Sequence, residues 1–68
     1  MEKETKIVLA VNDQRALYLF TRVYDDYKQV EFVVAYWDKP VNVGDYVDGW
    51  SCGHYFYNLE DAVEYLNR

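Results

Sequence analysis

Cysteine, proline and glycine are all scarce in this sequence of 68 residues, which has one cysteine, one proline and three glycines. A lone cysteine, Cys52, excludes an internal disulfide, so we expect a protein of the reducing cytoplasm and not a disulfide-stapled secreted domain. The longest apolar stretch near the start, Ile7 to Val11, is too short for a signal-peptide core or a membrane span. Repeats, low-complexity tracts and linkers are lacking as well, so the sequence predicts a single domain over residues 1–68.

Positive charge is also in short supply. Twelve Asp and Glu residues outnumber seven Lys and Arg residues, which gives a formal net charge of -5 at pH 7. Binding to a phosphate backbone requires cations that displace counterions, so this balance disfavours nucleic acid as a partner and favours proteins with basic surfaces. A simpler interpretation of the same charge is that it keeps a small domain soluble.

Apolar residues at every second position predict strands in the first half of the chain. Thr5 to Val11 is rich in β-branched and aliphatic residues, and the turn residues Asn12 and Asp13 follow it. Arg15 to Tyr24 then predicts the second strand of a hairpin, with a helix as the alternative, because its apolar residues also fit helical spacing. Gln29 to Trp37 alternates most clearly and predicts a third strand.

The second half of the chain predicts a loop, a short strand and a helix. Asp38 to Gly53 combines proline, glycine and aspartate, which is typical of a long irregular loop, and His54 to Tyr57 predicts a short aromatic strand. Asn58 is a suitable N-cap for a C-terminal helix, whose apolar stripe consists of Leu59, Ala62, Val63 and Leu66. The elements together predict an α+β fold: a three- to four-stranded antiparallel sheet with one C-terminal amphipathic helix packed on one face.

Aromatic side chains are abundant, since Tyr, Phe and Trp make up 19% of the chain. One short helix can cover only one face of such a sheet. Alternation along the strands assigns to the covered face Ile7, Leu9, Val11, Leu17, Leu19, Val23, Val30, Phe32 and Val34. The opposite face is then expected to be exposed, and it carries Val8, Ala10, Tyr18, Phe20, Tyr24, Val33, Ala35 and Trp37. A register shift of one residue would exchange the two faces.

An exposed aromatic face predicts a protein-binding surface, because large exposed apolar patches mark interfaces and Tyr and Trp carry much of the interface energy. We assign this contact to Tyr18, Phe20, Tyr24, Val33 and Trp37. The loop supplies a second candidate surface, made of Asp45, Tyr46, Asp48 and Trp50. The alternative is that the segment from Asp38 to Gly53 folds across the face and buries it.

Residue patterns that support catalysis or metal binding are weak. Cys52 and His54 form a Cys-x-His pair, but a zinc site requires four ligands, and nucleophilic catalysis requires a third residue that orients the base. The pairs of carboxylates lie in loop or helix-surface contexts that indicate solvated charge. We therefore expect no enzyme activity, no metal and no cofactor.

The residues from Gly53 to Leu66 carry a resemblance. There an aromatic strand runs into a helix that begins Leu59-Glu60-Asp61-Ala62, and this resembles the endings of many short proteins from phages and mobile elements of bacteria. The resemblance implies a context, because small, acidic, aromatic-rich phage proteins often act as stoichiometric inhibitors of host defence. Anti-CRISPR and anti-restriction proteins are examples, and some of them imitate the charge of DNA. It implies no role for any single residue.

The sequence thus predicts a small acidic module that acts by stoichiometric protein–protein contact. Its sharpest form is a phage-type inhibitor of a host nucleic-acid-binding defence protein. A homodimerising structural domain is one alternative. A sheet that binds single-stranded nucleic acid is another, because aromatic platforms can stack bases, although such a site also requires cations.

Overall fold

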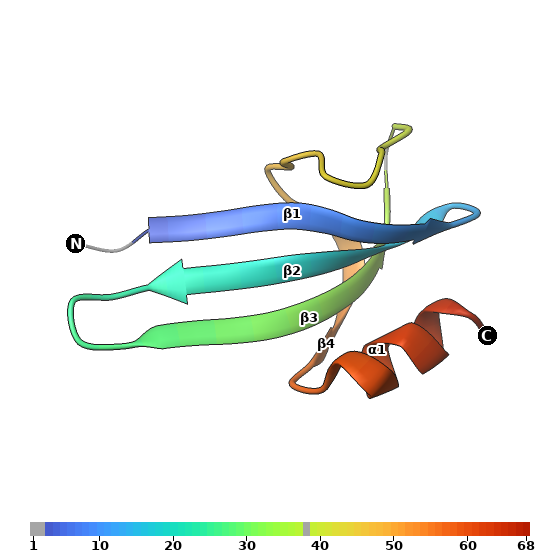
Figure 1. Ribbon diagram of the computed structural model, residues 1–68. Helices are drawn as coiled ribbons and strands as arrows, with labels where there is room; N and C mark the ends of the chain where they lie inside the picture. The colour runs from blue at the N-terminus through green and yellow to red at the C-terminus, as the bar shows by residue number, and fades with distance from the viewer. Residues whose placement is uncertain (1–2, 38) are drawn as a thin grey trace.

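The computed structural model describes residues 3–37 and 39–68, which form a four-stranded antiparallel sheet and one helix (Figure 1). The strands lie side by side in chain order, as β1 (Lys3–Asn12), β2 (Arg15–Val23), β3 (Lys28–Tyr36) and β4 (Ser51–Phe56), and α1 (Leu59–Leu66) follows. The predicted α+β fold is confirmed, and the helical alternative for the second segment is wrong. Asp38, the first residue of the predicted loop, lies outside the described residues.

In the described part of the chain, no helix is both long enough and apolar enough to span a membrane. The one helix has 8 residues, and at 1.5 Å per residue it is about 12 Å long.

Two irregularities distinguish the observed strands from the predicted ones. In β1, Val8 pairs with Tyr18 but Ala10 pairs with Leu17, so Leu9 is an extra residue that forms a bulge. Because of this bulge Ala10 lies on the face that the helix covers, while Val11 pairs with Ala16 and lies on the opposite face. The predicted faces of Ala10 and Val11 were therefore wrong.

The second irregularity lengthens β4. This strand begins at Ser51, three residues before the predicted start, because Ser51 pairs with Tyr36. Between that pair and the pair of His54 with Val34, Cys52 and Gly53 lie opposite the single residue Ala35, which forms a second bulge. Cys52 takes a φ of 54°, in the left-handed region that disfavours residues other than glycine.

The helix is fixed at both ends. At the start, the Asn58 side chain accepts a hydrogen bond from the Glu60 N–H at 2.7 Å, as predicted for an N-cap. At the end, two side chains of the first hairpin donate to backbone carbonyl groups that have no partner inside a helix. Asn12 donates to Leu66 O at 2.8 Å, and the Arg15 guanidinium donates to Tyr65 O at 3.2 Å.

The sheet is the middle layer of three. On the helix-side face, α1 packs over a buried cluster made of Leu17, Val34, Ala62 and Leu66. On the opposite face, the connection between β3 and β4 (residues 37–50) passes over a second buried cluster made of Val8, Ala16, Tyr18, Phe20, Val33 and Ala35. We call this the loop-side face. Both faces of the sheet are therefore covered at the end where the helix and the connection lie (Figure 1).

Candidate protein-binding site

The β3–β4 connection is attached along the outer edge of β1. Val8 donates its N–H to Asp45 O at 2.9 Å, and Gly44 donates to Val8 O at 2.8 Å. Val47 donates to Lys6 O at 3.0 Å, so residues 44–47 lie against β1 like a short additional strand. Gly44 has a φ of 94°, which glycine adopts without a steric penalty. These bonds protect an edge that would otherwise offer free backbone groups to another chain.

Trp50, the last residue of the connection, packs against the sheet. Its indole stacks on Tyr18 with ring centroids 4.9 Å apart, and it meets the Phe20 ring edge-on at 5.5 Å. The indole N–H donates to the Tyr55 hydroxyl at 3.2 Å. Gly53 makes room for the indole, because a Cβ atom at that position would lie 2.7 Å from Trp50 Nε1. Trp50 is therefore a packing residue of the loop-side core.

Two cations already lie against these rings. The Lys6 ammonium is 5.5 Å from the centre of the Phe20 ring and 5.7 Å from that of Trp50, and it donates to Asp48 O at 2.9 Å. The Arg22 guanidinium is 4.6 Å from the Phe20 ring centre. The pKa of Arg22 is raised above its ordinary value, chiefly by a hydrogen bond with the Tyr24 side chain. The aromatic rings of this face thus stabilise positive charges of the protein's own side chains.

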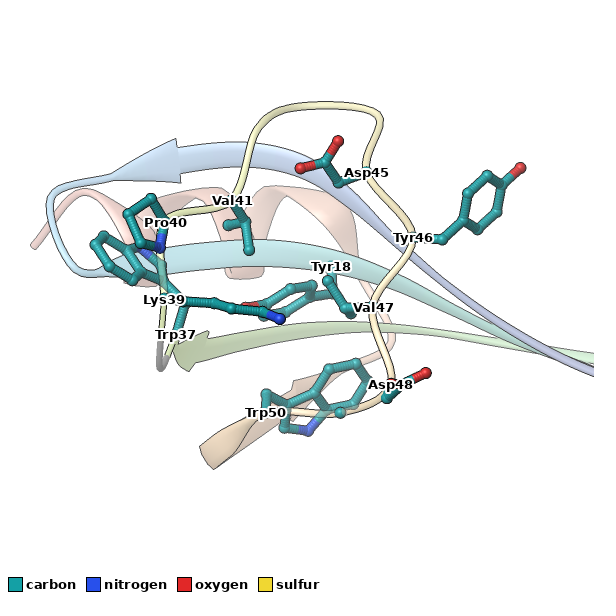
Figure 2. Close-up of a pocket in the computed structure, with 11 residues that line it drawn as sticks. Tyr18, Trp37, Lys39, Pro40, Val41, Asp45, Tyr46, Val47, Asp48 and Trp50 are labelled. Carbon is teal, nitrogen blue, oxygen red and sulfur yellow. The ribbon is translucent and has the colours of Figure 1, made fainter.

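A pocket of about 470 Å³ lies between the connection and the sheet (Figure 2). This volume falls in the range of pockets that bind small ligands. The pocket is lined by Tyr18 from β2 and by residues of the connection, namely Trp37, Lys39, Pro40, Val41, Asp45, Tyr46, Val47, Asp48, Gly49 and Trp50. It therefore combines aromatic and aliphatic walls with one ammonium group, and two acidic residues, Asp45 and Asp48, lie at its rim.

The opposite wall of the pocket from Trp50 is formed by Trp37, which is fixed to the first hairpin. Its backbone N–H donates to Gln14 O, and its indole N–H donates to Asp13 O, both at 3.2 Å. Asp45 is fixed too, because its Oδ2 accepts a hydrogen bond from the Asn42 N–H at 2.9 Å. Tyr46 differs from these residues, since the residue is 75% exposed and its ring points away from the pocket into solvent (Figure 2).

The predicted binding residues divide into three groups. Three of them are shielded by the chain itself: Tyr18 is 1% exposed, Phe20 is 5% exposed and Val33 is fully buried. The expectation that the aromatic face is exposed was therefore wrong, and the alternative, in which the loop folds across it, is what the structure has. The same burial removes the base-stacking platform that a single-stranded nucleic-acid site on this face would need.

The second group comprises the predicted residues that line the pocket from the connection, which are Trp37, Asp45, Tyr46, Asp48 and Trp50. The third is Tyr24 alone, which stacks on Tyr27 at 4.6 Å in the β2–β3 turn and does not line the pocket. Sequence reasoning did not assign to the site the other lining residues, which are Lys39, Pro40, Val41, Val47 and Gly49. No periodicity could have located them, because the path of an irregular loop depends on tertiary contacts.

The Cys-x-His pair does not form part of a larger group. His54 lies on the helix-side face, with its ring 4.7 Å from that of Tyr65, and Cys52 is exposed in the β4 bulge. Across the residues that the structure describes, no three His, Cys, Asp or Glu side chains gather in a way that could hold a metal ion.

A second surface lies on the helix-side face beyond the end of the helix. The molecule is 37 Å in its longest dimension, about three times the length of α1. Figure 1 shows the first three strands continuing past the helix toward the β2–β3 turn. Two paired rows of residues lie there, Thr5 with Thr21 and Val30, and Lys3 with Val23 and Lys28. Val23 and Val30 are 39% and 38% exposed.

Comparison with protein-family models, with curated proteins and with solved structures gives no match for this chain. Its function must therefore be argued from the site itself.

Proposed function

We propose that this protein is a binding module that forms a stoichiometric contact with another protein through the rim of the pocket. The observation that carries the proposal is the composition of this rim, where an exposed tyrosine, Tyr46, is flanked by the exposed carboxylates of Asp45 and Asp48. Tyrosine contributes a large contact area while its hydroxyl stays hydrated, which is why it is frequent at interfaces.

The attachment of the connection supports the same proposal. Residues 44–47 are hydrogen-bonded to β1, and Trp50 is packed on Tyr18 and Phe20. A loop held in this way loses little conformational freedom when a partner binds, so more of the contact energy remains as affinity. A mobile loop with the same side chains would bind more weakly.

The charge of the chain selects the kind of partner. The net charge is -5, and the two carboxylates at the rim add local negative potential. A partner with a basic surface would be attracted over a distance of about one Debye length, which is ~8 Å at physiological ionic strength. In its sharper form, the proposal is that the partner is a host nucleic-acid-binding protein whose basic surface the module covers, as phage-type inhibitors do.

The test compares capture by the wild-type protein with capture by a pocket-rim variant. The rim variant carries Asp45→Asn, Tyr46→Ala and Asp48→Asn, all at exposed positions, and the amide oxygen that Asp45→Asn introduces can still accept the hydrogen bond from the Asn42 N–H. The matched control is Tyr57→Ala, because Tyr57 is 83% exposed but lies between β4 and α1 and does not line the pocket. Proteins captured from bacterial lysate at low and high salt are identified, purified and titrated by calorimetry.

The proposal expects saturable binding of a basic protein at a fixed stoichiometry. The rim variant should lose at least about tenfold in affinity, as expected for removal of an interface tyrosine and two charges, and the Tyr57 variant should not. Binding should also weaken as salt rises. An inhibitor should in addition release the partner from its nucleic acid in proportion to the amount added. If the rim variant binds the partner as tightly as the wild type does, the pocket rim is not the binding surface.

Self-association is a second candidate function, and the uncovered part of the helix-side face favours it. Val23 and Val30 are partly exposed there, and Leu59 and Val63 on α1 are 47% and 39% exposed. A second copy of the chain would cover this apolar surface. The mass in solution distinguishes the two functions, because contact through the pocket rim does not require a dimer.

A further inference from the structure

The side chain of Lys39 extends across the pocket. It begins beside Trp37 and Pro40, and its ammonium group points toward the side formed by Val47 and Trp50 (Figure 2). Of the described residues that line the pocket, it is the one with a positive charge. Lys39 forms no salt bridge with another residue of the described part of the chain.

The walls around this ammonium group are suited to a cation. Trp37 and Trp50 are both held in place by hydrogen bonds from their indole N–H groups, to Asp13 O and to the Tyr55 hydroxyl. Fixed indole rings present an electron-rich face without further ordering, and tryptophan is the best aromatic partner for a cation. Asp45 and Asp48 add two negative charges to the lining, so its charge is -1 when Lys39 is counted.

Contacts on the other side of the aromatic cluster of Phe20 and Trp50 show that these rings attract cations. Lys6 lies against Trp50 and Phe20, and Arg22 lies against Phe20. The chain thus places two of its own cations against these rings, and Lys39 places a third cation among the residues that line the pocket.

We propose that the pocket receives an arginine side chain of the partner protein, and that Lys39 is an intramolecular competitor that leaves the pocket when the arginine enters. This inference rests on the proposed function and names the group that the pocket recognises. An arginine fits better than a lysine, because its planar guanidinium stacks on indole rings and donates in two directions to carboxylates. It is also more weakly hydrated than an ammonium group, so it loses less on entering an apolar pocket.

Lys39 is suited to the role of competitor because it is weakly held. Lys39 is exposed and belongs to an irregular segment, and it forms no salt bridge or cation–π contact with another described residue, so its departure from the pocket costs little. Removing its charge should therefore strengthen arginine binding, although the same substitution makes the whole chain more acidic by one unit. Lys28 provides the control for that global effect, because it is exposed at the start of β3 and does not line the pocket.

The experiment titrates the protein with three capped tripeptides, acetyl-Gly-Arg-Gly-amide, acetyl-Gly-Leu-Gly-amide and acetyl-Gly-Glu-Gly-amide. The two indole N–H resonances of Trp37 and Trp50 are followed by NMR. We expect saturable shifts of both resonances with the arginine peptide and no saturation with the other two. Lys39→Met keeps the length of the side chain and should lower the dissociation constant by about threefold, whereas Lys28→Met should change it far less.

Two results would overturn the inference. One is a leucine peptide that binds as well as the arginine peptide, which would make the pocket an apolar site. The other is a Lys39→Met protein that binds arginine no better than Lys28→Met, which would show that Lys39 does not compete. Asp45→Asn with Asp48→Asn should weaken arginine binding, and an unchanged amide spectrum elsewhere verifies that this variant is folded.

The failure of this inference is distinguishable from that of the proposed function. Suppose that the arginine peptide does not bind, while the rim variant still binds the protein partner more weakly than the wild type. The rim then binds the partner without an inserted arginine, and only the inference fails. If neither the peptide nor a protein partner responds to changes at the pocket, both fail.

Discussion

The ring of Tyr18 lies nearly parallel to the indole of Trp50, with the ring centroids 4.9 Å apart and an angle of 27° between their planes. Tyr18 belongs to a central strand and is 1% exposed, whereas Trp50 belongs to the connection before β4. This contact explains part of the high aromatic content of the chain. On the loop-side face, which the helix does not cover, the ring of Trp50 covers the ring of Tyr18. The contact also fixes one wall of the pocket.

The first prediction concerns the space that Gly53 leaves for Trp50. A Cβ atom at position 53 would lie 2.7 Å from Trp50 Nε1 and 3.2 Å from Val33 Cγ1, so Gly53→Ala forces the indole away from Tyr18. We expect a loss of about 1–3 kcal/mol in the free energy of unfolding, as for other overpacked cores. Urea unfolding followed by tryptophan fluorescence measures it.

Gly49→Ala is the matched control for this substitution. A Cβ atom at Gly49 meets nothing within 4 Å, and its φ is not in the left-handed region that favours glycine. Stability should stay within about 0.5 kcal/mol of the wild type. Equal effects of the two alanine substitutions would show that the clash at Gly53 is relieved without moving Trp50.

The second prediction concerns Lys6, which joins β1 to the connection. Its ammonium donates to Asp48 O and lies against the rings of Phe20 and Trp50. Lys6→Met keeps the aliphatic chain but removes the charge, and we expect a loss of about 1 kcal/mol in the free energy of unfolding. Amide exchange of Val47, which donates to Lys6 O, should become faster because the connection opens more often.

Lys3→Met is the control for Lys6→Met, since Lys3 is an exposed lysine of the same strand. The two substitutions change the net charge equally. If both proteins lose the same stability, the effect is one of net charge and the contact of Lys6 with the rings contributes nothing.

The sequence was sufficient to predict the elements that depend on local pattern. The helix from Leu59 to Leu66 and its Asn58 cap follow from spacing and from one favourable side chain, and both are confirmed. The first three strands follow from alternation, with ends that lie within two residues of the predicted ones. The bulge at Leu9 could not be predicted, because an extra residue in one strand is defined only by its pairing with another.

The coverage of the sheet was beyond the reach of local pattern. Residues 37–50 have no periodicity, and their path depends on distant contacts, such as the backbone bond from Val8 to Asp45 and the stack of Trp50 on Tyr18. Counting aromatic residues correctly indicated that the helix alone could not cover them. It could not indicate whether a partner or the chain itself does so, and at Tyr18 and Phe20 the chain does.

The third prediction concerns the backbone at Cys52. This residue is exposed and has a φ of 54°, where a side chain other than that of glycine is strained by about 1–2 kcal/mol. Cys52→Gly removes the strain but adds freedom to the unfolded chain, so we expect a net gain of about 0.5 kcal/mol. Cys52→Val should lose stability, since a β-branched residue tolerates this conformation least. Urea unfolding under reducing conditions should give the highest free energy of unfolding for Cys52→Gly, then the wild type, then Cys52→Val. A Cys52→Val protein as stable as the wild type would contradict a strained backbone at Cys52.

The fourth prediction concerns self-association through the uncovered helix-side surface. Val30 lies in the row of Thr5, Thr21 and Val30, near the β2–β3 turn, and is 38% exposed. If a second copy packs there, Val30→Lys must bury a charge in the contact and should raise the dimer dissociation constant by about tenfold or more. Val43→Lys makes the same chemical change at a residue of the connection that is 66% exposed, and it should leave the constant unchanged. Sedimentation equilibrium over a hundredfold range of concentration measures the constants. A wild-type protein that stays at the monomer mass over the whole range would refute self-association and leave the pocket rim as the proposed contact surface.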